Sequence, residues 1–101
     1  MPPQVAVIGD ALLDIHVTAS SAIRPGADIP ARVRLEPGGQ GANLAVRLAR
    51  RGVDVRLTCA LGEDTAGTML RNALAADGVD LRPIPVDATG SVLVLVAVDG
   101  E

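Results

Sequence analysis

The stretch EPGGQGANLAVRLARRG, residues 36 to 52, places three glycines within four positions directly before an amphipathic segment. Glycine has no Cβ, so it reaches backbone conformations with positive φ and lets another group approach the main chain closely. A helix that starts here presents unpaired N–H groups and a partial positive charge, which favour anions and hydroxyl oxygens. The stretch therefore predicts a helix over residues 42–51 whose beginning is open to a polar small molecule.

Apolar β-branched runs alternate with helical patterns along the chain. The expected strands occupy residues 4–9, 53–62, 79–86 and 91–101. The first of them, QVAVIG, has no polar interruption after Gln4 and is interpreted as a central strand covered on both faces. The segment 79–86 contains two prolines, which confine it to an edge of the sheet. Alternation of strand and helix is typical of an α/β fold with a parallel sheet and helical cover.

Two helices are expected between these strands. The second of them, over residues 63–78, has Asp64 or Thr65 as its N-cap and Gly78 at its end. The apolar stripe of the first helix consists of Leu44, Val46, Leu48 and Ala49. Each helix therefore has one apolar face with which it can cover the sheet.

Residues 15–36 have a different pattern from the rest of the chain. Apolar and polar residues alternate with a period of two on both sides of a turn at residues 24–28, RPGAD. This alternation predicts strands with one covered face, and the turn joins them. We expect a hairpin that stands apart from the main sheet.

Composition limits the classes of function. The chain has no Phe, Tyr or Trp for base stacking, and its net charge of −3 gives no basic footprint, so nucleic acid is not an expected partner. Because the sequence contains no Lys, a P-loop is excluded. No apolar stretch approaches the length of a membrane span, and no cationic segment precedes the first apolar run. We therefore expect a cytoplasmic protein that binds no membrane.

Asp14 and Asn43 are the polar side chains that could complement the glycine loop. Asn43, one turn into the helix, carries a donor and an acceptor, which suits a sugar hydroxyl. Asp14 follows the first strand, at the edge where open α/β sheets bind ligands, and its carboxylate could accept bonds from two hydroxyls. The alternatives are a loop carboxylate that ends a strand and a tight glycine connection without a ligand. The combination of the two features favours a binding site.

Three segments resemble the N-terminal part of the ribokinase-like, or pfkB-type, carbohydrate kinases. They are VAVIGDALLDIHV (5–17), PGGQGANLAVRLARRGVDVRLTCALGEDTAGTMLRNALAADGVDLRPI (37–84) and TGSVLVLVAVDGE (89–101). The likeness covers essentially the whole chain in order and spacing. It implies a three-layer α/β/α sandwich, truncated here, with a small β-sheet lid formed by residues 15–36 and part of 85–98. Lid pairing in this family implies a possible homodimer.

The resemblance also implies an activity and a site. Members transfer the γ-phosphoryl group of ATP, with Mg²⁺, to a hydroxyl of a sugar, nucleoside or related small molecule. The residues that match the family's acceptor site are Asp14, Gly39 and Asn43, with Gly38 and Gly41 allowing the close approach. Gln40 stands where ribokinases have Lys, and Leu12 where they have Asn, which argues against ribose as the acceptor.

The resemblance places the family's catalytic base, in a G-A-G-D motif, and its ATP-binding half beyond Glu101. No catalytic residue and no metal ligand is therefore assigned within the chain. Since phosphoryl transfer depends on positioning and charge stabilisation, we expect a substrate-binding segment of a kinase that is inactive alone and that exposes an uncovered sheet edge and apolar face.

Two alternatives stand beside this interpretation. One is a non-catalytic module that binds a small polyol or dimerises through its lid. The other is a nucleotide-binding domain of the dehydrogenase type, whose G-x-G-x-x-G pattern is broken here by Leu44.

Overall fold

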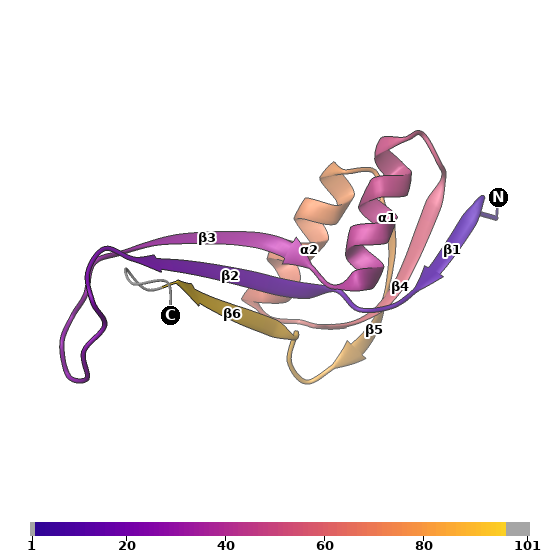
Figure 1. The fold of residues 1–101 in the computed structure, drawn as a ribbon. Helices are drawn as coiled ribbons and strands as arrows, with labels where there is room; N and C mark the ends of the chain where they lie inside the picture. Colours follow the sequence, from indigo (N-terminus) through magenta and orange to yellow (C-terminus); the bar gives the residue numbers. More distant parts are fainter. Residues whose placement is uncertain (1, 97–101) are drawn as a thin grey trace.

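The computed structural model describes residues 2–96 and shows the expected order of elements (Figure 1). The strands are β1 (Val5–Ile8), β2 (Leu12–Ala19), β3 (Ala31–Gly38), β4 (Val55–Gly62), β5 (Asp80–Val86) and β6 (Ser91–Val96). The helices are α1 (Gln40–Arg50) and α2 (Thr65–Ala76). Residues 97–101, which the sequence assigns to the last strand and in part to the lid, lie outside the described residues. Within residues 2–96, no helix has the length and apolar character needed to cross a membrane.

Strands β1, β4 and β5 form a parallel sheet with β4 at its centre. Both helices lie on the same side of this sheet (Figure 1). The two crossovers, from β1 to β4 and from β4 to β5, move in the same direction across the sheet, and right-handed crossovers of this kind place their helices on one side. Alternate side chains of β4 point toward the helices. The fully buried residues of the resulting core are Ala42 and Ala45 of α1, Val55, Leu57 and Leu61 of β4, and Leu70 and Leu74 of α2.

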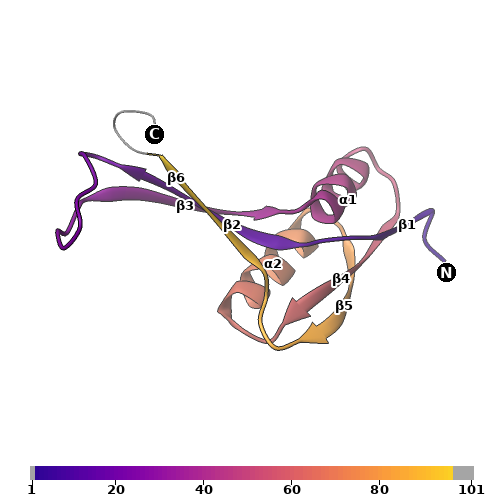
Figure 2. The ribbon, with the colours of Figure 1, turned by 60° about the horizontal axis from the view of Figure 1, so that its bottom comes forward.

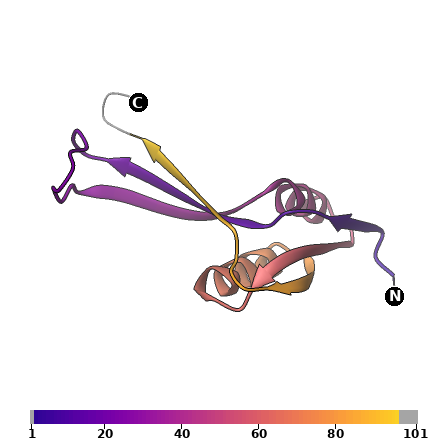
Figure 3. The ribbon, with the colours of Figure 1, turned by 90° about the horizontal axis from the view of Figure 1, so that it is seen from below.

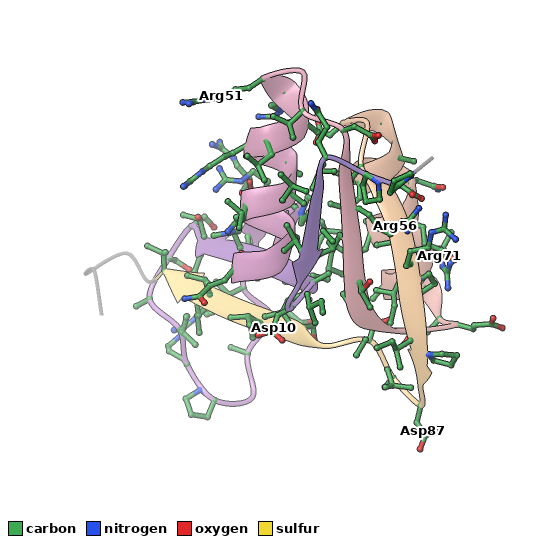
Figure 4. The ribbon with its side chains drawn as sticks, turned by 90° about the vertical axis from the view of Figure 1, so that its right-hand side faces the viewer. Asp10, Arg51, Arg56, Arg71 and Asp87 are labelled. Carbon is green, nitrogen blue, oxygen red and sulfur yellow. The ribbon has the colours of Figure 1, made fainter. Side chains whose placement is uncertain are left out.

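The opposite face of the sheet is open in the described part of the chain (Figure 4). Ile8 of β1 is 84% exposed and Ile84 of β5 is 53% exposed, while Arg56 pairs with Asp80 across the same face at 3.1 Å. Within residues 2–96, the strand at residues 4–9 is therefore neither central nor covered on both faces, which differs from the interpretation of its sequence. Among residues 2–96, β1 pairs only with β4 and is therefore an edge strand. Because both crossovers place their helices on one side, only one of its faces is covered. Residues 2–96 thus contain the sheet and one helical layer of the predicted sandwich.

Helix α1 begins at Gln40, earlier than the sequence predicts. Gly39 is its N-cap with a φ of +92°, a conformation that glycine adopts without strain. The predicted apolar stripe is partly wrong, because Leu44 is 48% exposed and the most buried positions are Gly41, Ala42 and Ala45. Small residues are needed on this face because α1 packs closely against β1 and β4.

Strands β2, β3 and β6 form a second sheet, in the order β3-β2-β6, which extends away from the helices (Figure 2). We call this sheet the lid. Strands β2 and β3 are an antiparallel hairpin, as predicted, and β6 pairs with β2 in parallel (Figure 3). The ladder runs from the Leu12–Gly38 pair to the Ala19–Ala31 pair, so the hairpin is longer than residues 15–36. Val86 belongs to β5 of the main sheet, and the described part of the third lid strand begins at Ser91.

Asp64 and Thr89 fasten the lid to the main sheet. Asp64 is the N-cap of α2, as predicted, and its Oδ1 accepts from the Gly67 N–H at 2.8 Å. The buried Thr89 hydroxyl donates to the same Oδ1 at 2.6 Å and accepts from the Gly62 N–H at 2.9 Å. The Thr89 N–H donates to the other carboxylate oxygen, Asp64 Oδ2, at 2.9 Å. Hydrogen bonds from the Thr89 hydroxyl, and then from the N–H groups of Thr89 and Gly67, hold the pKa of Asp64 below its usual value. The connection into β6 is therefore anchored to the start of α2.

We expect Thr89→Val to lower the free energy of unfolding by about 1–3 kcal/mol, because it leaves the buried Gly62 N–H without an acceptor. Urea unfolding followed by circular dichroism measures the change. Thr18→Val, on an exposed lid position with the same change of side chain, is the control and should change stability little. Equal effects of the two substitutions would contradict the anchoring role of Thr89.

Candidate functional site

The loop after β1 packs directly against the start of α1. The Ala42 N–H donates to the carbonyl oxygen of Asp10 at 2.9 Å, and Asp10 lies at the end of β1 beside α1 (Figure 4). A Cβ at Gly39 would lie 2.7 Å from the Asp10 oxygen, and one at Gly41 would lie 2.7 Å from the carbonyl carbon of Gly9. These two glycines are therefore required by contact between backbone segments of the chain itself.

Gly38 is required for a different reason, because it faces the side chain of Asp14. Leu12 is the cross-strand partner of Gly38, and Asp14, two residues further along β2, lies on the same face of the lid. A Cβ at Gly38 would fall on the Asp14 carboxylate. Asp14 lies within strand β2, whereas the sequence placed it in a loop after the first strand. The structure nevertheless brings the predicted carboxylate and the glycine loop together.

Asn43 lies in the first turn of α1 with an exposed side chain. It lines a cavity of ≈230 Å³ together with Glu36, Arg47 and Arg50. Glu36 is the cross-strand partner of Asp14, so this cavity adjoins the part of the lid that carries Asp14. The predicted residues therefore gather where the lid meets the start of α1.

The start of α1 has unused hydrogen-bonding capacity. Gly39 supplies no side-chain cap, and the first turn contains no acidic residue. The N–H groups of Gln40 and Gly41 have no acceptor among residues 2–96, whereas the Ala42 N–H is taken by Asp10. Two N–H groups and the positive end of the helix dipole thus remain for an oxygen atom of a ligand.

Two polar residues at this place were not among the predicted site residues. Glu36 lies beside Asp14 only because of the strand register, and the hairpin pattern alone does not define which residues are opposite each other. Asp10 lines a second hollow of ≈250 Å³ on the other side of the start of α1, with Gln40 and Gly41. The Gly9-Asp10 pair at the end of β1 is the sequence feature that could have indicated Asp10 as a site residue, but such a pair is equally typical of a strand that ends in a turn.

Comparison with known proteins gives consistent matches over nearly the whole chain. A family model described as pfkB family carbohydrate kinase matches residues 2–101. The chain is 42% identical over 90 residues to the bifunctional protein HldE of Azorhizobium caulinodans, covering 83% of this chain and 19% of that protein. It is 32% identical over 97 residues to the ribokinase of Bacillus subtilis, covering 92% and 33%.

Solved structures show the same similarity. A carbohydrate kinase from Agrobacterium tumefaciens superposes with a TM-score of 0.86 at 30% identity, over 96% of this chain and 32% of that one. A ribokinase from Cryptococcus neoformans in complex with ADP has a TM-score of 0.74 at 32% identity, over 96% and 31%. The chain therefore spans between about a fifth and a third of the length of these relatives.

We expect Gly38→Ala to lower the free energy of unfolding by about 1–3 kcal/mol, because its methyl group must displace the Asp14 carboxylate. In an Asp14→Ala background, Gly38→Ala should lower the free energy of unfolding by at least about 1 kcal/mol less, because the carboxylate that the methyl group would displace is absent. Urea unfolding of the four variants of this double-mutant cycle gives the coupling. Additive effects would show that the two residues are not in contact.

Proposed function

The chain belongs to the pfkB family of carbohydrate kinases, and we propose that it forms the acceptor-binding part of such a kinase. The membership confirms the resemblance seen in the sequence, and the solved neighbours confirm the ribokinase-like α/β fold. In this proposal the acceptor is a sugar, a nucleoside or a related small molecule that offers a hydroxyl to the phosphoryl group of ATP.

The contact between Asp14 and Gly38 is the observation that carries the proposal. It brings a lid carboxylate to the glycine loop, so that one small ligand could touch both the lid and α1. We assign Asp14 the role of accepting hydrogen bonds from two acceptor hydroxyls, and Asn43 that of donating to or accepting from a third. The free N–H groups of the first turn of α1 would hold an oxygen of the same molecule. Gly38, Gly39 and Gly41 keep side chains out of this space.

The described residues do not fit a site for ATP and Mg²⁺. Residues 2–96 contain no group of three or more His, Cys, Asp or Glu side chains that could hold a metal ion, and the sequence has no Lys. We propose that the nucleotide site and the catalytic base belong to the part of the relatives that this chain does not span. The residues present would bind and orient the acceptor, and they would transfer no phosphoryl group by themselves.

We expect the chain to bind a hydroxyl-rich small molecule, and Asp14→Ala or Asn43→Ala to raise the Kd about tenfold or more, because each removes a hydrogen bond from the ligand. NMR titration with D-ribose, D-fructose and adenosine measures the affinity. Asn72→Ala is the matched control, since Asn72 is another exposed helical asparagine and lies on α2.

Two outcomes of this titration, and one of a separate phosphate-transfer assay, are informative. Loss of affinity in the Asp14 and Asn43 variants, with Asn72→Ala unchanged, supports the site. Equal affinity in all variants would refute the assignment of Asp14 and Asn43. Transfer of radiolabelled phosphate from ATP to any of these three compounds by the chain alone would refute the proposal that it is inactive by itself.

We propose lid-mediated self-association as a second function, on the evidence of one apolar lid face. The strand register places six aliphatic side chains on the side opposite Asp14. They are Ile15, Val17, Val33, Leu35, Leu93 and Leu95. Leu93 is 63% exposed and Val33 is 57% exposed. An exposed aliphatic surface of this kind favours burial against a second copy of the lid.

We expect the chain to self-associate with rising concentration, and Leu93→Arg to shift it toward the monomer, because a charge on this face opposes burial. Sedimentation velocity over a concentration series measures the distribution of species. Val94→Arg adds the same charge on the neighbouring residue, which points to the other lid face, and should leave association unchanged. A monomer at every concentration would exclude this role of the lid.

A further inference from the structure

Glu36 stands directly opposite Asp14 in the β2–β3 ladder, so the two carboxylates share one face of the lid. Like charges at directly opposed positions of an antiparallel pair repel each other and destabilise the hairpin. The neighbouring residues on this face therefore have to offset the repulsion. They also determine how the Glu36 carboxylate is presented.

Arg34 holds one oxygen of Glu36 by a hydrogen bond, and His16 lies near the same oxygen. The Arg34 Nε donates to Oε1 at 2.8 Å, and the His16 Nε2 lies 3.5 Å from the same atom. The other oxygen, Oε2, has no partner among residues 2–96, and the side chain is 45% exposed. The carboxylate is therefore oriented by one oxygen and open at the other, which can accept hydrogen bonds from a ligand.

Glu36 also lines the ≈230 Å³ cavity that contains Asn43. Glu36 is thus a neighbour of two residues of the proposed acceptor site, because it pairs with Asp14 in the ladder and lines the same cavity as Asn43. We propose that Glu36 is a second acceptor-binding carboxylate, whose Oε2 accepts a hydrogen bond from a hydroxyl of the acceptor. This inference rests on the function proposed above, and it deepens that function by favouring acceptors with hydroxyls on two separate carbon atoms, one for each carboxylate.

The test compares Glu36→Gln with Asp28→Asn in the full chain. Both substitutions neutralise one lid carboxylate, but Asp28 is exposed in the β2–β3 turn region and forms no ion pair within residues 2–96. NMR titration with D-ribose, D-fructose and adenosine gives the Kd, and monodeoxy analogues of the ligand that binds most tightly show which hydroxyl is involved. We expect Glu36→Gln to raise the Kd about tenfold while Asp28→Asn leaves it unchanged. One monodeoxy analogue should bind the wild type more weakly than its parent, yet bind Glu36→Gln as well as the parent does.

A second variant, Glu36→Asp, keeps the charge but withdraws the carboxylate by one methylene group, and it should also weaken binding. Glu36→Asp replaces Glu36→Gln in this test if the amide NMR spectrum of Glu36→Gln shows that it does not keep the wild-type fold. Wild-type affinity in a folded Glu36 variant, with affinity lost in Asp14→Ala, overturns the role of Glu36 and leaves the proposed site intact. Absence of binding by the unmodified chain overturns both.

Discussion

Contact between two backbone segments, the end of β1 and the start of α1, is the constraint on which the rest of this structure depends. The Asp10 carbonyl accepts from the Ala42 N–H, and neither Gly39 nor Gly41 could carry a Cβ without meeting the opposing main chain. Beside this contact, the N–H groups of Gln40 and Gly41, the first two of α1, have no acceptor among residues 2–96. The contact also sets where β2 leaves the sheet, and hence where Asp14 lies.

The lid is consequently joined to the sheet at two separated places. One is the β1–α1 contact at the base of β2, and the other is the Asp64–Thr89 network at the base of β6. Since β2 and β6 pair with each other, the two attachments act on one hydrogen-bonded sheet. The face that carries Asp14 and Glu36 is therefore positioned relative to α1 by two sets of hydrogen bonds at one end of the lid, where β2 and β6 begin side by side, although β3 itself is largely exposed.

Local patterns predicted the order of elements, the hairpin, the Asp64 cap and the position of β5 at an edge, because each depends on residues close together in sequence. Tertiary features were not predictable in this way. The exposure of Ile8 depends on which side both helices occupy, and that of Leu44 on how closely α1 approaches the sheet. The pairing of Asp14 with Glu36 depends on strand register, which the alternating pattern does not specify. Residue chemistry pointed to Asp14 and Asn43, and the likeness to a family matched both to an acceptor site, but neither supplied Glu36.

The parallel pairing of β6 with β2 has a consequence for the order of folding. The connection between these two neighbours runs through β3, α1, β4, α2 and β5, so both helices and two of the three strands of the main sheet lie within the crossover of a single strand pair. Contacts that are so distant along the chain form late, after shorter loops have closed. The β2–β3 hairpin can assemble locally, but its third strand is added only when the α/β unit has folded. During synthesis, the aliphatic side of the hairpin is therefore displayed before its full sheet exists.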